Sequence, residues 1–400
     1  MLLIDRQKNL ELFCDQLRSV AAPVAIDTEF ISERRYFARL CLVQVRAENG
    51  DEAVEALIDP LSASRLDLAP LLDIVSDAAI IKLVHAGGQD LQILFQEYGC
   101  VARNVFDTQI AAAFLGYGHQ AGYADLVRRV AHGPQLSKDM QLTDWAARPL
   151  SPAQMEYAIA DVRYLTEIYT KLHRDLKARG RLEWAETEFR RAEIRATETA
   201  PADELYQKFN LSGLSRRQLA TLREVAATRD ALARSIDKPP SFIMPDPVLL
   251  QMAKHPPNDA ATLRSTRGMP GLSQTHTREV MAAIQRAADM EPSNYPERGS
   301  YERPDPQIEN VAALLGIVIQ LRAGQHDISR TYLAPREQVM TLASWWLRRD
   351  GSTPPDMALL SDWRRELVGA ELLELLDGRM TIALDAAPGQ PAIKVLKIPG

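Results

Sequence analysis

The 400-residue chain has only three cysteines, Cys14, Cys41 and Cys100, which lie far apart and form no Cys-x-x-Cys pair. So few scattered cysteines argue against a disulfide framework and against structural zinc, and they favour a reducing compartment. No apolar run approaches the length of about 20 residues that a membrane-spanning helix needs. The N-terminus becomes charged at Asp5 and Arg6, which is too early for a signal peptide. We therefore expect a cytoplasmic protein without a membrane partner.

Positive charge is not in excess either. The 53 aspartates and glutamates outnumber the 47 lysines and arginines, so the formal net charge is −6. This balance argues against binding of nucleic acid by the whole surface. The segment from Lys208 to Lys238 differs, because seven basic residues outnumber three acidic ones and give it a local charge of +4. We expect phosphate contacts from this segment rather than from the surface as a whole.

Composition and length favour a folded chain of more than one domain. Hydrophobic residues make up 46% and charged residues 25% of the sequence, as in globular proteins, and 400 residues suit two or three domains. The elements expected in the first half are a helix over 5–17, strands from Val24, over 39–45 and over 53–58, and then alternating helices and strands up to Leu165. This order predicts a mixed sheet with helices on both faces.

The second half shows helical patterns only. A long helix is expected over 211–236, with Ser215 as its N-cap and Pro239-Pro240 just beyond its end. Further helices are expected over 247–254, 258–264, 311–321, 335–346 and 361–376. We expect Trp345, Trp346 and Trp363 in the core, because they lie in amphipathic helices.

Two carboxylates, Asp27 and Glu29, end the apolar run Val24-Ala25-Ile26. Side chains two residues apart on a strand point to the same face. Two carboxylates on one face repel each other unless a cation lies between them, so the pattern indicates a hard divalent metal. Taken alone, Asp-x-Glu is common, and a strand end followed by a solvated loop would explain it better.

A second acidic position follows the strand near Ile80–Val84. Gly87-Gly88 comes next, where glycine allows a tight turn and close approach of another chain segment. A helix is expected to begin near Gln89-Asp90. Asp90 in a first helical turn also has an ordinary explanation, which is its favourable interaction with the helix dipole. On this segment alone the two explanations are equally good.

A third acidic position lies on a helix that Ser151-Pro152 opens, with Ser151 as the N-cap. Tyr157 and Asp161 are four residues apart and therefore share one face of that helix. Ile159, Val162 and Leu165 supply the face that packs in the core. By itself, the tyrosine and aspartate pair would be explained better as an ordinary hydrogen bond.

Together the three segments resemble the three exonuclease motifs of the DEDD superfamily of 3′-to-5′ exonucleases. The matching residues are Asp27-x-Glu29, Asp90 and Tyr157-x-x-x-Asp161, and the tyrosine is typical of the DEDDy branch. Flanking stretches narrow the resemblance to the ribonuclease D family: Ile26–Phe30, His85–Gly87, Asp107–Gln109, Thr143–Leu150 and Glu156–Leu165. This resemblance implies a ribonuclease H-like α/β fold for the first domain.

The helical half resembles further parts of the same family. Leu214–Met244 is similar to an HRDC domain, a helical nucleic-acid-binding module, and Ser329–Leu342 resembles part of a second, diverged one. A bundle that only makes contacts within the chain is the alternative. The fold class expected is thus an α/β ribonuclease H-like exonuclease domain followed by two all-α HRDC-like domains. The expected boundaries are an exonuclease domain over 1–177, a helical linker over 178–204, an HRDC domain over 205–290, a proline-rich linker over 291–306, a diverged HRDC-like domain over 307–385 and a tail over 386–400.

The resemblance also implies a cofactor of two divalent ions, Mg²⁺ or Mn²⁺, which prefer oxygen ligands. Asp27, Glu29 and Asp161 would hold one ion. Asp27 and, through water, Asp90 would hold the other. Tyr157 would position the attacking water, because a phenol with a reference pKa of about 10 is a weak base at neutral pH and orientation is the easier role.

The implied activity is hydrolysis of RNA by a monomeric enzyme, which trims 3′ extensions of transfer-RNA precursors and releases nucleoside 5′-monophosphates. The residues expected to contact substrate are Thr28, Phe30, His85 and Lys138 beside the carboxylates, and Arg216, Arg217 and Arg223 in the basic segment. Core packing is an equal alternative for Phe30. A DNA 3′-exonuclease stays open, because carboxylates and metals do not distinguish the sugar. A catalytically silent RNA-binding protein is disfavoured, since all four acids and the tyrosine are present.

Overall fold

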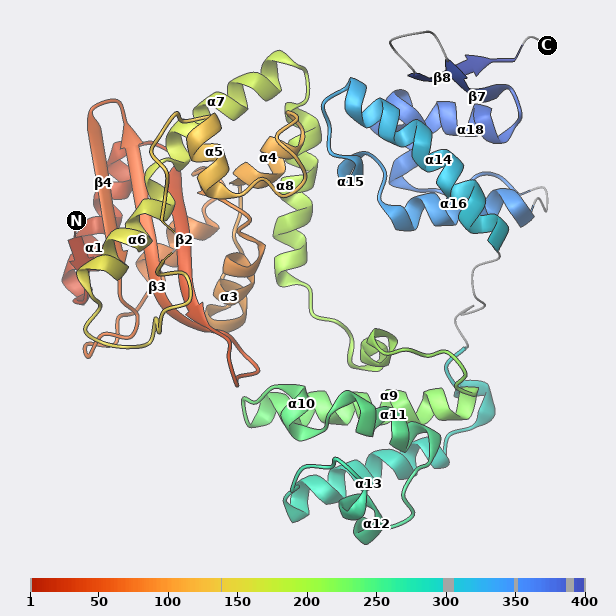
Figure 1. Cartoon of the computed structure of the whole chain (residues 1–400). Helices are drawn as coiled ribbons and strands as arrows, with labels where there is room; N and C mark the ends of the chain where they lie inside the picture. The colour runs from red at the N-terminus through yellow and green to blue at the C-terminus, as the bar shows by residue number, and fades with distance from the viewer. Residues whose placement is uncertain (1, 138, 298–305, 349–351, 386–391, 399–400) are drawn as a thin grey trace.

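The computed structural model describes residues 2–137, 139–297, 306–348, 352–385 and 392–398. The chain forms an α/β domain, a helical domain with its own core, and a C-terminal unit that packs against the α/β domain (Figure 1). Within the described residues, no helix is long and apolar enough to cross a membrane. The three cysteines are buried free thiols.

A six-stranded mixed sheet forms the centre of the α/β domain. Its strands are β1 (Leu2–Ile4), β2 (Val24–Ile31), β3 (Arg39–Asn49), β4 (Glu52–Ile58), β5 (Lys82–Val84) and β6 (Val105–Asp107). They lie in the order β1-β4-β3-β2-β5-β6. The central strand β3 pairs antiparallel with β2 and with β4, and the outer pairings are parallel. The mixed sheet expected from the sequence is confirmed.

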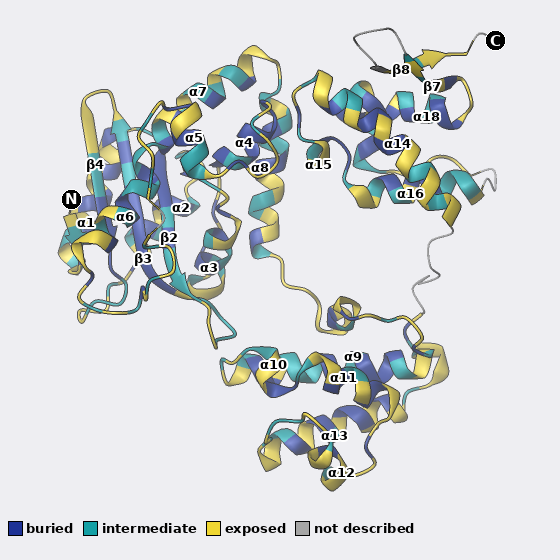
Figure 2. Cartoon of the chain, viewed as in Figure 1, coloured by how far each residue is buried: buried dark blue, intermediate teal, exposed yellow. Residues whose placement is uncertain are grey.

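Strand β2 contributes to two cores, because side chains alternate between the faces of a strand. Val24 and Ile26 face the first core and Ala25 faces the second. Asp27 and Glu29 continue the face of Ala25. The helices over the first core are α1 (Gln7–Val20), α2 (Ala69–Ser76) and α3 (Gly88–Tyr98). Those over the second core are α4 (Thr108–Ala113), α5 (Tyr123–Arg129), α6 (Pro152–Arg163) and α7 (Leu165–Ala178). Helices therefore cover both faces, and the buried residues lie in the strands and on the inner sides of the helices (Figure 2).

The helical domain has a core of its own. Its elements are the 3₁₀ helix η1 (Ala202–Lys208) and the α-helices α9 (Arg216–Ser235), α10 (Pro240–Ile243), α11 (Asp246–Lys254), α12 (Ala260–Ser265) and α13 (Gln274–Ala288). Ser215 caps α9 as expected: its hydroxyl accepts from the Gln218 N–H at 3.3 Å, and the Gln218 side chain accepts from the Ser215 N–H at 2.8 Å. This reciprocal pair satisfies two backbone donors at the helix start.

The helical domain docks on the loop that follows β2. The Asp237 carboxylate accepts from the backbone N–H groups of Tyr36 and Phe37, both at 3.1 Å, and forms a 2.6 Å ion pair with Arg35. The Tyr36 hydroxyl donates to Asp230 at 2.8 Å. One short loop thus joins the helical domain to the strand that carries Asp27 and Glu29.

The C-terminal unit shares a core with the α/β domain instead of forming a separate one. Its helices are α14 (Pro306–Gln325), α15 (Arg330–Leu333), α16 (Arg336–Arg348), α17 (Asp362–Arg364), the π-helix η4 (Arg365–Gly369) and α18 (Ala370–Leu376). Helix α8 (Leu182–Thr197), which follows α7 in the chain and precedes the helical domain, packs in the same shared core. The helices expected here from the sequence are confirmed. Trp363 is buried, and Trp345 and Trp346 pack against the same core, as predicted.

Two contacts fix the C-terminal unit in place. Trp363 stacks on Trp184 of α8 with ring centroids 4.8 Å apart and meets Phe114 edge-on at 5.7 Å. Arg364 pairs with Glu188 of α8 at 2.6 Å, and each of these two residues is only 4% exposed. Removing one partner of a buried ion pair strongly destabilises the folded state. This contact therefore fixes the position of the C-terminal unit on α8. The segment predicted as a linker over 178–204 therefore also contributes to the core, because α8 packs between the α/β domain and the C-terminal unit.

Two predictions about the end of the chain were wrong. Strands β7 (Met380–Asp385) and β8 (Ala392–Lys397) form an antiparallel ribbon, whereas we expected only helices to 385 and a tail over 386–400. Alternation of apolar and polar residues in Ile393-Lys394-Val395 gave a short strand signal that we did not use. Part of the predicted linker over 291–306 lies outside the described residues.

Candidate active site

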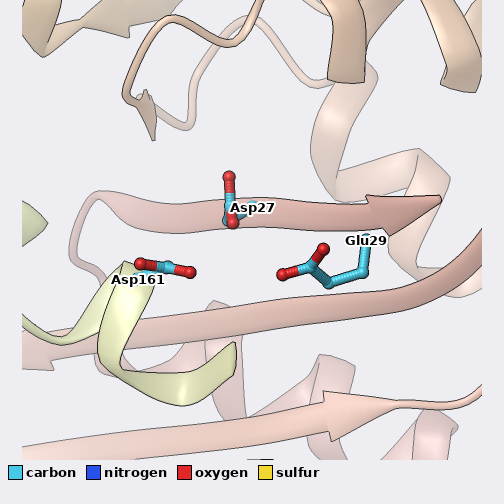
Figure 3. Close-up of side chains that lie close together, drawn as sticks. All are labelled: Asp27, Glu29 and Asp161. Atoms are coloured by element: carbon cyan, nitrogen blue, oxygen red, sulfur yellow. The ribbon is translucent and has the colours of Figure 1, made fainter. Parts of the chain in front are cut away.

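Asp27 and Glu29 extend from β2 on the face covered by α6, and Asp161 comes from the last turn of α6. One carboxylate oxygen from each of the three lies within 4.8 Å of the other two. Figure 3 shows the carboxylates of Glu29 and Asp161 facing each other beside Asp27. All three residues are half-buried. The register between β2 and β3 shifts between Glu29 and Phe30, and pairing continues beyond the shift at Phe30 and Ile31.

The sequence places Asp161 through the way α6 begins. The Ser151 hydroxyl accepts from the Gln154 N–H at 3.2 Å, and the Gln154 side chain accepts from the Ser151 N–H at 3.0 Å. Pro152 occupies the first helical position. The predicted N-cap is therefore confirmed. With the start of the helix fixed, Tyr157 and Asp161 share the face that looks toward β2.

Asp90 joins the cluster from the first turn of α3, and it contacts Thr28 instead of a carboxylate. The Thr28 hydroxyl donates a hydrogen bond to the Asp90 carboxylate. The Thr28 side chain is buried, and its hydroxyl orients Asp90. Strand alternation turns Thr28 away from Asp27 and Glu29, and its contact with substrate stays a prediction.

The turn before α3 is held by Asp107, whose role we did not predict from the sequence pattern. Its carboxylate accepts from the N–H groups of Ala86 at 3.0 Å and Gly87 at 3.1 Å. Ala86 has a φ of 55°, and a Cβ at Gly87 would lie 2.7 Å from the Val84 side chain. Glycine is therefore required there, and Asp107 stabilises a backbone conformation that most residues avoid. Asp107 lies between strand β6 and helix α4, and an aspartate at such a position is a typical N-cap that the sequence alone could have indicated.

The carboxylates share an environment that favours their protonated forms. Burial, followed by the charges of Asp161 and Asp90, raises the pKa of Glu29 to about 8. Burial raises the pKa of Asp161 to about 7 and that of Asp90 to about 6. The pKa of Asp27 is raised well above its usual range by burial and then by the charges of the other three acids.

Tyr157 lies beside the cluster as a neutral phenol. Its ring centroid is 6.1 Å from that of Trp145. Burial raises its pKa above the ordinary value, and the charges of Asp161, Glu29 and Asp27 act in the same direction. A phenol with a raised pKa keeps its proton at neutral pH, so Tyr157 can orient a water molecule through hydrogen bonds but is a poor base.

His85 is also uncharged. Its Nδ1 lies 2.9 Å from the Thr108 hydroxyl, and its ring centroid is 5.6 Å from that of Tyr123. Burial lowers its pKa to about 4. A neutral imidazole can form hydrogen bonds but offers no charge to a phosphate.

The remaining predicted contacts are spread over the molecule. Phe30 is half-buried and packs against the first core, as its alternative explanation expected. Lys138 lies outside the described residues. Arg216 and Arg223 hold the helical domain together: Arg216 donates to the backbone oxygens of Tyr295 and Pro296, and Arg223 to the sulfur of Met290. Arg217 is exposed at the start of α9. The structure does not bring the arginines into the carboxylate cluster.

Oxygen atoms alone form the cluster, and this donor set fits Mg²⁺ or Mn²⁺ better than a soft metal. Burial first, and then the charges of the neighbouring acids, raise the pKa values of Asp27 and Glu29. A divalent cation would remove the repulsion between these charges. The residues present therefore fit the metal that the sequence predicted.

Comparison with known proteins agrees with this geometry. A family model described as 3′-5′ exonuclease matches residues 1–177, and one described as HRDC domain matches residues 218–284. Ribonuclease D of Sphingobium indicum is 34% identical over 387 residues, which is 96% of this chain and 96% of that protein. Ribonuclease D of Acidiphilium cryptum is also 34% identical, over 95% of this chain and 94% of that protein.

A solved structure supports the same relationship. The crystal structure of Escherichia coli RNase D, described as an exoribonuclease involved in structured RNA processing, superposes with a TM-score of 0.80 at 31% sequence identity. The match covers 94% of this chain and 98% of that one. It extends through the α/β domain, the helical domain and the C-terminal unit. The chain therefore belongs to the ribonuclease D family of 3′-to-5′ exoribonucleases.

Proposed function

We propose that this chain trims 3′ extensions from structured RNA, such as transfer-RNA precursors, and releases nucleoside 5′-monophosphates. The observation that supports this most directly is the convergence of Asp27, Glu29 and Asp161 from two different elements, with oxygens within 4.8 Å of one another. Four half-buried acids with raised pKa values have no structural use that apolar residues would not serve better. They fit the hydrolysis of a phosphodiester.

Asp27, Glu29 and Asp161 would hold one ion, and Asp27 and Asp90 would hold the other. Two bound Mg²⁺ or Mn²⁺ ions supply an acidified water and charge stabilisation for the leaving oxygen. Thr28 keeps Asp90 oriented toward the cluster through its hydroxyl. Tyr157, neutral and on the face of α6 that carries Asp161, orients the attacking water. His85, also neutral, offers a hydrogen bond near the end of the RNA chain.

The proposal is tested with purified protein on a transfer-RNA precursor that has a 3′ extension and on a DNA strand of matching sequence, each with Mg²⁺ or Mn²⁺. We expect stepwise loss of nucleotides from the 3′ end of the RNA and release of 5′-monophosphates. Asp161→Asn should abolish this release while RNA binding persists, because only a metal ligand is lost. Faster digestion of DNA would favour the DNA exonuclease, and residual activity in Asp161→Asn near that of the unmodified protein would refute the metal assignment.

The acids also predict how stability depends on pH without metal. An acid whose pKa is higher in the folded than in the unfolded chain stabilises the folded state at low pH, and this contribution is lost as pH rises through the folded pKa. With Glu29 at about 8, Asp161 at about 7 and Asp90 at about 6, the melting temperature in EDTA should fall between about pH 4 and pH 8. Mn²⁺ should reverse the fall, because it binds the ionised carboxylates.

The control for this measurement is Asp161→Asn, which removes one titrating group and one negative charge. Its melting temperature in EDTA should lie above that of the unmodified protein at pH 8, and its response to Mn²⁺ should be smaller. Equal pH profiles for the two proteins would contradict the assignment of repulsion to this cluster.

Tyr157→Phe should lower turnover and leave RNA affinity nearly unchanged. The ring still fills its place beside Trp145, and only the hydroxyl that orients the water is lost. Misplacing a nucleophile costs on the order of 100-fold in rate. Steady-state kcat, together with RNA affinity measured in EDTA, checks this. If kcat were unaffected and affinity reduced, Tyr157 would belong to substrate packing.

RNA binding by the helical domain is best tested at Arg217. A triple reversal of Arg216, Arg217 and Arg223 would disturb the domain, since two of these side chains hold its internal contacts. Arg217→Glu should weaken binding of a transfer-RNA precursor and lower the salt slope by about one, as expected for a phosphate contact. Lys8→Glu on α1 is the matched control, because it reverses an exposed charge over the first core. Identical effects of the two changes would assign the helical domain to packing alone.

A further inference from the structure

The junction between α6 and α7 is interrupted by a side chain from α5. In an uninterrupted α-helix the Tyr164 N–H would donate to the Ala160 carbonyl, four residues earlier. The Tyr123 hydroxyl takes that place: it accepts from the Tyr164 N–H at 3.1 Å and donates to the Ala160 oxygen at 3.1 Å. The Tyr164 N–H also reaches back to the Val162 carbonyl, two residues earlier. Insertion of a side chain into the helical ladder is a recognised cause of a bend.

The interruption lies directly beside a carboxylate of the active site. Ala160 precedes Asp161 in the chain, so a hydroxyl that fixes the Ala160 carbonyl also fixes the backbone from which the Asp161 side chain extends. The charges of Asp161 and Asp27 both raise the pKa of the Tyr123 hydroxyl, after burial as the main cause. The hydrogen bond to the Ala160 oxygen places this hydroxyl one residue before Asp161 on the backbone of α6. Its position therefore affects the cluster through backbone geometry.

Tyr123 is itself held firmly. It begins α5, whose residues Leu126 and Val127 are fully buried in the second core. The ring lies against His85, with centroids 5.6 Å apart. The residue before the N-cap of α5, Ala121, accepts a hydrogen bond from the Gln109 side chain at 3.2 Å. These contacts hold the Tyr123 side chain in place, so its hydroxyl can fix the backbone groups of the neighbouring helix to which it is hydrogen-bonded.

We propose that Tyr123 is a positioning residue for the metal ligand Asp161. Its hydroxyl keeps the α6–α7 bend open, and the bend places the Asp161 carboxylate beside Asp27 and Glu29. Without the hydroxyl, the Tyr164 N–H and the Ala160 carbonyl would form the direct helical bond, and Asp161 would turn with the straightened helix. This inference rests on the proposed metal site and concerns a residue outside the three exonuclease motifs.

The test compares Mn²⁺ affinity, measured by calorimetry, for the unmodified protein, Tyr123→Phe and Tyr169→Phe. Tyr169 is the matched control, because its ring packs edge-on against Phe106 at 4.8 Å and no hydrogen bond of its hydroxyl is present in the described part of the chain. We expect Tyr123→Phe to bind Mn²⁺ about 10- to 100-fold more weakly, the usual effect of losing a partner that orients a ligand. Tyr169→Phe should bind within twofold of the unmodified protein.

Kinetics separate positioning from loss of folded protein. In Tyr123→Phe, kcat at low Mn²⁺ should fall and should recover as Mn²⁺ is raised, while RNA affinity in EDTA stays unchanged. A smaller folded fraction would lower RNA binding as well. Equal Mn²⁺ affinities of Tyr123→Phe and the unmodified protein would overturn this inference alone. Absence of Mn²⁺ binding to the unmodified protein would overturn the proposed function and this inference with it.

A second measurement needs no substitution and so remains decisive if Tyr123→Phe does not fold. Coupling between two sites is reciprocal. If the bend positions Asp161 for the metal, Mg²⁺ binding must in turn stabilise the bend and slow hydrogen exchange at the Tyr164 amide. Amides in the last turn of α7, far along the helix from the bend, serve as the internal reference. An exchange rate at Tyr164 that is unchanged by saturating Mg²⁺ would contradict the proposal.

Discussion

Repulsion among four half-buried carboxylates is the constraint around which this fold is built. Asp27, Glu29, Asp90 and Asp161 would separate if their backbones were free, because each is more stable in water and away from the others. Each acid therefore needs a support that resists this separation. Those supports come from parts of the chain that are distant in sequence, and they explain why a small cluster depends on so much surrounding structure.

Strand β2 is the support for two of the acids. It lies in the middle of the sheet, pairs with neighbours on both sides and packs against helices on both faces. The loop that follows it is bound by Asp237 and Asp230 of the helical domain. A shift of β2 would therefore disturb two cores and the docking of the helical domain. RNA bound by the helical domain would therefore be held in a fixed position relative to β2, the strand that carries Asp27 and Glu29.

The residues that we propose for the chemistry could be predicted from the sequence, and the residues that support them mostly could not. Asp27, Glu29, Tyr157 and Asp161 follow local periodic rules, since spacing on a strand or a helix decides which side chains share a face. The cap at Ser151 is equally local. Tyr123 has no such signal, because its partners, Ala160 and Tyr164, are far away in sequence and are backbone groups that any residue would provide.

Partners that are distant in sequence also explain why other residues make contacts that we did not predict. Thr28 was expected to contact substrate, and its hydrogen bond to Asp90 could not be predicted, because Asp90 is distant in sequence. Arg216 and Arg223 were expected to bind phosphate because they add to a local positive charge, yet their partners are carbonyl oxygens and a sulfur, which charge counting does not detect. Charge and periodicity describe a residue's type and direction, and only the folded chain shows whether its hydrogen bonds are already taken.

The boundary of the exonuclease illustrates this most clearly. A family model for the catalytic domain ends at residue 177, and all four acids and Tyr157 precede that point. The physical core does not end there. Phe106 packs against Phe189 of α8 with ring centroids 4.7 Å apart, and the fully buried Phe114 lies against Trp363. A chain cut after Lys177 would expose these rings to water, at a cost of about 1.5–3 kcal/mol for each large apolar side chain. The residues proposed for catalysis all precede residue 177, but the structure that holds them together against their charge includes the C-terminal unit.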